Sequence, residues 1–118
     1  MSTVRLSAGD FADTVAAAGI VLVDFRASWY GPSRGFAPVF EAAAERHPDL
    51  VFATVDAEAE RGLAAAVGVR AVPTLMVFRD GVPVFAEPGA LPADSVELLI
   101  ATVRELDMGA VRETFPHR

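Results

Sequence analysis

Residues 29–34 read Trp-Tyr-Gly-Pro-Ser-Arg and lie between two segments of different character. The run 21–25 before them is nearly all apolar, as in a strand that is buried on both faces. The Ala-rich segment after them has apolar residues at helical spacing. Gly31 and Pro32 predict a tight turn that opens a helix. Such a turn places its side chains at a helix N-terminus, where unpaired N–H groups favour a negatively charged reactive group.

The residues on either side of Gly31-Pro32 carry no thiol. They are Tyr30 and Ser33, and the chain contains no cysteine. Disulfide bonds, thiol redox chemistry and thiolate metal sites are therefore excluded. The histidines, His47 and His117, are far apart in sequence, and neither lies near a pair of acids at ligand spacing. We therefore expect no metal site and no cofactor.

Length and composition indicate one globular domain. The chain has 118 residues, of which 53% are hydrophobic and 22% are charged. This composition is typical of a folded protein with a single core. We expect one domain over residues 1–106 and a polar extension over residues 107–118, from which Met108, Val111 and Phe115 could dock weakly.

Charge and hydropathy restrict the partners and the compartment. The net charge of -6 opposes binding to nucleic acid, because phosphate backbones are also negative. No apolar run approaches the roughly 18 residues of a membrane span. Residues 1–5 lack the features of a signal peptide. We therefore expect a cytoplasmic protein, monomeric or weakly dimeric, with no nucleic-acid or membrane partner.

Periodicity and turn signals predict alternating helices and strands. The predicted helices span 8–18, 32–46, 56–67 and 92–106, and the predicted strands span 20–25, 50–55, 74–78 and 82–86. Asp80-Gly81 predicts a hairpin between the last two strands, and Pro83 restricts the final strand to a sheet edge. Parallel crossovers together with this antiparallel hairpin indicate an α/β fold, with a mixed central sheet of about four to five strands and helices on both faces.

The order and spacing of these motifs resemble the thioredoxin family. The resemblance extends from about residue 6 to 106 and rests on the following residues: Val23-Asp24-Phe25, Ala27-Ser28-Trp29, Gly31-Pro32, Arg34, Ala37-Pro38, Val55-Asp56, Gly68-Val69, Val72-Pro73-Thr74 and Gly81. It implies the thioredoxin fold. It also implies the family's activity, which is the reduction of protein disulfides in cell redox homeostasis.

The chain departs from the family at the residues that carry this chemistry. The family pattern is Trp-Cys-Gly-Pro-Cys, and here Tyr30 stands at the first cysteine and Ser33 at the second. In the family the first cysteine attacks a substrate disulfide, and the second resolves the mixed disulfide. Such exchange requires thiolates. We therefore expect dithiol oxidoreductase activity to be absent.

The resemblance also bears on Asp24 and Thr54. Asp24 matches a buried family carboxylate that assists proton transfer to the second cysteine, and Thr54 occupies the position of a lysine that often lies near this acid. Asp24 could act as a general base on Ser33. The simpler interpretation is a retained buried acid with a raised pKa. A hydrolase built on Ser33 would also need a better base, and no histidine lies nearby in sequence.

A peptide-binding surface is implied even without the thiols. In the family the tryptophan flanks the substrate peptide, and a cis-proline, matched here by Pro73, exposes the backbone of the residue before it. We therefore expect a binding surface made of Trp29, Tyr30, Gly31, Pro32, Val72, Pro73 and Gly89. Tyr30 could either line this surface or cover it.

The sequence leaves alternative functions open. The first is a redox-inactive thioredoxin-like domain that binds an extended peptide or partner protein at the groove. The second is a thioredoxin paralogue or variant, a protein-disulfide oxidoreductase by descent, whose thiols have been substituted. The third is a structural module that self-associates through the apolar patch.

Overall fold

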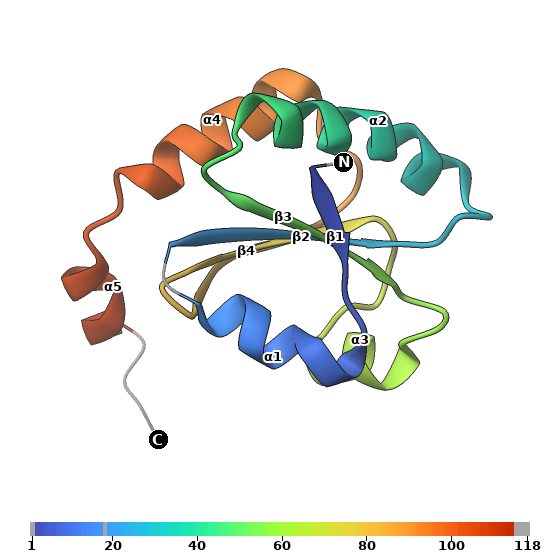
Figure 1. Cartoon of the computed structure of the whole chain (residues 1–118), viewed down its shortest axis with the longest axis horizontal. Coiled ribbons are helices and arrows are strands. Elements are labelled where there is room, and N and C mark those ends of the chain that lie inside the picture. Colours follow the sequence, from blue (N-terminus) through green and yellow to red (C-terminus); the bar gives the residue numbers. More distant parts are fainter. Residues whose placement is uncertain (1, 18, 115–118) are drawn as a thin grey trace.

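The centre of the molecule is a sheet with the strand order β1-β3-β2-β4-β5. The computed structural model describes residues 2–17 and 19–114 (Figure 1). The strands are β1 (Thr3–Arg5), β2 (Ile20–Arg26), β3 (Val51–Asp56), β4 (Thr74–Arg79) and β5 (Val82–Pro88). β1 and β2 each run parallel to β3, whereas β4 is antiparallel to both β2 and β5. The mixed sheet predicted from the sequence is therefore confirmed.

Helices cover both faces of this sheet, as predicted (Figure 1). α2 (Gly31–Arg46) and α4 (Ala93–Arg104) lie on one face, and α1 (Ala8–Ala16) and α3 (Arg61–Ala66) lie on the other. A further short helix, α5 (Met108–Thr114), follows α4. Within the described ranges no helix has the length and apolar character needed to cross a membrane.

The alternation of side chains along β2 explains its continuously apolar sequence. Leu22 belongs to a core cluster with Phe40 of α2 and Ile100 of α4. Val23 belongs to the opposite cluster, which includes Phe11 of α1. Successive side chains of a strand point to opposite faces of a sheet. A strand between two layers of helices must therefore be apolar at nearly every position.

The hairpin between β4 and β5 forms at the predicted residues. Asp80 and Gly81 both have positive φ, 53° and 82°, as a two-residue type I′ turn requires. Oδ1 of Asp80 accepts a hydrogen bond of 2.8 Å from the N–H of Gly19, which joins the hairpin tip to the turn before β2. β5 lies at the edge of the sheet, the position at which a strand tolerates a proline such as Pro83.

Some element boundaries differ from the predictions. The sequence predicts no strand over residues 3–5, yet β1 pairs with β3 there. The predicted start of the third helix at residue 56 is wrong, because α3 begins at Arg61. Oδ1 of Asp56 accepts hydrogen bonds from the N–H groups of Glu58 and Ala59 and holds a turn in place of the first helical residues. The helix predicted over 8–18 ends at Ala16, and position 18 lies outside the described residues.

The extension over residues 107–118 contains the helix α5, which the sequence did not predict. Oδ1 of Asp107 accepts hydrogen bonds from the N–H groups of Gly109 and Ala110 at 3.0 and 3.2 Å and so begins the helix. Met108 is buried. Phe115, which was also expected to dock, lies outside the described residues.

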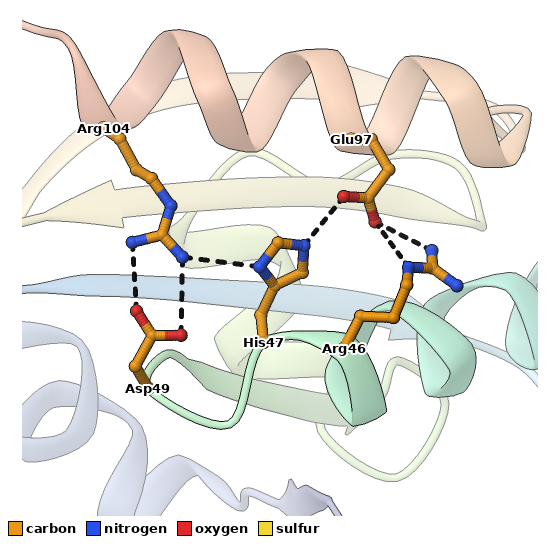
Figure 2. A network of polar contacts seen from close by, with 5 residues as sticks. All are labelled: Arg46, His47, Asp49, Glu97 and Arg104. Atoms are coloured by element: carbon orange, nitrogen blue, oxygen red, sulfur yellow. Dashed lines mark hydrogen bonds and ion pairs between the residues drawn. The ribbon is translucent and has the colours of Figure 1, made fainter.

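Polar contacts join the end of α2 to α4 (Figure 2). Oε2 of Glu97 accepts a hydrogen bond of 2.8 Å from Arg46, and Oε1 of Glu97 lies 2.8 Å from Nε2 of His47. Arg104 pairs with Asp49 at 3.0 Å. The hydrogen bond from His47 and that from Arg46 lower the pKa of Glu97, and the hydrogen bond from Arg104 lowers the pKa of Asp49. These contacts hold α4 against α2.

Candidate functional site

The turn between β2 and α2 positions Tyr30 and Ser33 very differently. Tyr30 is the residue that precedes the first turn of α2, and its carbonyl accepts a hydrogen bond of 3.0 Å from the N–H of Arg34. The side chain of Tyr30 is 40% exposed, whereas Ser33 is 1% exposed. The residue at the first family cysteine therefore faces solvent, and the residue at the second is buried.

Ser33 has a structural partner. Its Oγ accepts a hydrogen bond of 3.0 Å from the N–H of Ala27, a buried group in the loop before the helix. This bond joins the first turn of α2 to the loop that precedes the helix. A buried hydroxyl in this position cannot meet a substrate, so the geometry opposes a hydrolase built on Ser33.

Asp24 is a buried acid, as the sequence predicted. Its Oδ2 accepts two hydrogen bonds from Arg26, and its Oδ1 is buried without a hydrogen-bond partner in the described part of the chain. Burial raises the pKa of Asp24. Arg26 opposes this shift, and Glu41 adds to it. Thr54 lies beside Asp24 in the β2–β3 register, as expected, and brings no charge.

Arg26 is a partner that the sequence analysis missed. Its guanidinium lies 2.8 Å from Asp24 and 3.6 Å from Glu41, so it bridges two acids. Residues at i and i+2 of a strand share a face of the sheet. The Asp-Phe-Arg order of residues 24–26 was therefore a usable signal for this ion pair. The acid that serves a thiol in the family here holds an arginine.

A groove of about 520 Å³ lies beside the turn. It is bounded by the β2–α2 loop, the turn after β3, α3 and the segment that leads into β4. Of the predicted binding residues, Trp29, Tyr30 and Val72 line it. Tyr30 therefore lines the groove. We call this cavity the Trp29 groove.

The other predicted binding residues lie outside the lining of the groove. Pro73 is buried, and the Val72–Pro73 peptide bond is cis. The carbonyl of Pro73 accepts a hydrogen bond of 2.7 Å from the N–H of Gly89. Gly31 and Pro32 are exposed in the first turn of α2. Gly89 and Pro73 are thus joined to each other, and none of these four residues lines the Trp29 groove.

An aromatic pair and two arginines make the lining of the Trp29 groove partly aromatic and partly charged. The rings of Trp29 and Tyr30 have centroids 5.4 Å apart, and Trp29 is 63% exposed. Arg61, Arg70 and Glu58 also line the groove. None of these three residues belongs to the binding surface predicted from the sequence. No sequence pattern signalled their position, because it depends on how α3 and the following segment pack.

Comparisons with known proteins agree with this architecture. Residues 2–102 match the Thioredoxin family model. The chain is 50% identical over 112 residues to "Putative thioredoxin 2" of Streptomyces coelicolor, a match that covers 95% of this chain and 84% of that protein. It is 40% identical over 96 residues to a thioredoxin of Chlamydia muridarum, covering 81% of this chain and 93% of that protein.

The fold comparison agrees with the sequence comparison. A solved structure of a mutant thioredoxin from Halobacterium salinarum NRC-1 matches with a TM-score of 0.81 at 34% identity, covering 88% of this chain and 92% of that one. The family model spans most of the chain, and the solved thioredoxin structure shares its fold over 88% of it. This chain, with Tyr30 and Ser33 in the active-site turn, belongs to the thioredoxin family.

Proposed function

We propose that this chain is a thioredoxin-family protein without disulfide reductase activity, which binds an extended peptide segment of a partner protein in the Trp29 groove. The observation that carries the proposal is the exposed pair of Trp29 and Tyr30, whose side chains are 63% and 40% exposed beside a cavity of about 520 Å³. Large aromatic side chains that stay exposed at the edge of a cavity are typical of a protein-binding surface.

The backbone beside the groove supports an extended ligand. Val72 precedes β4 and lines the groove. Its N–H and C=O have no hydrogen-bond partner among residues 2–17 and 19–114. An extended peptide could pair with these groups as an added strand does, while its side chains pack on the two aromatic rings.

The absence of reductase activity follows from the residues of the turn. The phenol of Tyr30 cannot form a mixed disulfide, and the buried hydroxyl of Ser33 cannot resolve one. We therefore expect the purified chain to leave the reduction of insulin disulfides by dithiothreitol at its background rate. A rate clearly above background would overturn this part of the proposal.

Restoring the thiols tests whether the loss of chemistry lies in these positions alone. We expect the double variant Tyr30→Cys/Ser33→Cys to accelerate insulin reduction. Ser33→Cys alone is the matched control, because a single thiol cannot complete the cycle. If the double variant stayed at background, the loss of activity would not lie in these two positions alone.

The binding half of the proposal is tested by selecting short random peptides displayed on phage. We expect wild type to enrich peptides that bind Trp29→Ala at least about tenfold more weakly, since one central aromatic residue often carries that much binding energy. Leu98→Ala is the matched control, because Leu98 is 69% exposed on α4 and does not line the groove. Equal loss in both variants, or no enrichment on wild type, would overturn the proposal.

A further inference from the structure

Most arginines in the described part of the chain have partners. Arg5, Arg26, Arg46, Arg104 and Arg112 form ion pairs with carboxylates. Arg79 donates hydrogen bonds to backbone carbonyls at the end of α4. The exceptions are Arg34, Arg61 and Arg70, whose side chains have neither an ion pair nor a hydrogen bond with any described residue. In a chain with a net charge of -6, the positions of these cations decide where positive charge is available to a partner.

Two of these unpaired arginines line the Trp29 groove. Arg61 is the first residue of α3, Arg70 lies in the segment before β4, and both are exposed. Glu58 also lines the groove, and it forms no ion pair with either arginine. The groove therefore has an excess of positive charge on a molecule that is negative overall. Local charge of one sign favours a partner of the opposite sign.

We propose that the peptide bound in the Trp29 groove carries an acidic side chain, which Arg61 and Arg70 hold while neighbouring apolar residues of the peptide pack on Trp29 and Tyr30. This inference rests on the proposed function and adds the chemistry of the ligand. An arginine guanidinium can bind a carboxylate through two parallel hydrogen bonds. The net charge of -6 disfavours long polyanions, so one carboxylate between apolar residues suits this protein better than a nucleic acid does.

The test uses the peptides that the display selection yields. Aspartate or glutamate should be enriched at one position or more. A synthetic copy of an enriched peptide, free of tryptophan, is then titrated against the whole protein. Trp29 is the single tryptophan of the chain and lines the groove, so its fluorescence reports on occupancy directly. Replacing the acidic residue of the peptide by its amide should weaken binding to wild type about fivefold, the upper end of the range expected for exposed charge pairs.

Variants of the protein locate the effect. In Arg61→Gln/Arg70→Gln the acidic peptide and its amide should bind within about twofold of each other, because the cations that distinguish them are gone. Arg112→Gln makes a change of the same kind on α5, outside the groove lining, and should leave the preference intact. Glu58→Gln should strengthen binding of the acidic peptide. With wild type, about 0.5 M salt should reduce the preference, a measurement that needs no variant to fold.

The outcomes separate this inference from the proposed function. If enriched peptides quench or shift the Trp29 signal but are neutral, or if the amide binds as well as the acid, the groove binds peptides and the acidic preference is wrong. The same holds if the preference survives in Arg61→Gln/Arg70→Gln. If no peptide is enriched and none changes the Trp29 signal, the proposed function itself is wrong, and this inference fails with it.

Discussion

Arg26 donates two hydrogen bonds to Oδ2 of Asp24, from Nε at 2.9 Å and from Nη2 at 2.8 Å, within one strand. The carboxylate is fully buried, while the arginine side chain keeps 25% of its surface exposed. Arg26 also lies 3.6 Å from Glu41 of α2, so the pair lies between β2 and that helix. We interpret it as a structural ion pair that replaces the partnership between acid and thiol.

Removing Arg26 should destabilise the fold. In Arg26→Gln the buried carboxylate of Asp24 loses its cation, and we expect the free energy of unfolding at neutral pH to fall by about 2 kcal/mol. This loss is smaller than the usual cost of breaking a fully buried pair because Arg26 is partly exposed. Urea unfolding measures the change. The loss should be much smaller in an Asp24→Asn background, and additive losses in the double variant would contradict the pairing.

Asp24 should also give stability a pH dependence of defined sign. Burial raises the pKa of Asp24 in the folded protein above the ordinary value of 3.8, despite the opposing charge of Arg26. Between the unfolded and the folded pKa the folded state binds more protons, so the contribution of Asp24 to stability falls as pH rises. Asp24→Asn cannot titrate. We therefore expect its stability relative to wild type to increase with pH across this interval.

The measurement is urea unfolding of wild type and Asp24→Asn at a series of pH values. The difference between the two curves isolates Asp24 from the other carboxylates. A difference that does not change with pH, or that changes in the opposite direction, would show that the pKa of Asp24 is not raised.

The sequence predicted the parts of the fold that depend on local signals. Asp80 and Gly81 predict the turn because they are residue types that tolerate the positive φ it requires. Pro83 predicts that its strand lies at an edge of the sheet. β1 was missed because a strand of 3 residues is too short to show alternation. The start of α3 was predicted wrongly because an aspartate side chain accepts hydrogen bonds from backbone N–H groups in the same way in a turn and at a helix N-terminus. In this protein Asp56 holds a turn.

The candidate site was only partly predictable, because some of its residues are brought together by long-range packing. Trp29, Tyr30 and Val72 were found through the resemblance, and they line the groove. Arg61 and Arg70 were not found, since their place beside Trp29 results from long-range packing rather than from spacing along the chain. The strand positions of Asp24 and Arg26, by contrast, already implied a shared face.

Ser33 should prove to be a structural residue. Ser33→Ala removes the acceptor for the buried N–H of Ala27 and should cost about 1–3 kcal/mol, the usual penalty for an unsatisfied buried group. Peptide binding should be unchanged at temperatures where the variant is folded. Thermal unfolding and the Trp29 titration measure the two effects. A variant of wild-type stability would show that the bond to Ala27 contributes nothing.

Glu97 should contribute a small, salt-sensitive stabilisation through the contacts shown in Figure 2. Its pKa is lowered by the hydrogen bond from His47 and then by that from Arg46, so its contribution is present above its ordinary pKa near 4.5 and is lost as pH falls through the folded value. We expect Glu97→Gln to cost at most about 1 kcal/mol at neutral pH and low salt, and less at high salt. A cost that is unchanged by salt and by acidification would contradict an electrostatic origin.

The central claim is that the Trp29 groove binds an extended peptide, and NMR mapping of backbone amide shifts tests it most directly. An isotope-labelled sample of the whole chain is titrated with an enriched peptide. We predict that the perturbed amides cluster at Trp29, Tyr30, Arg61, Arg70 and Val72, which line the groove. Perturbations confined to α1, α4 or α5, or no perturbation at saturating peptide, would contradict the account.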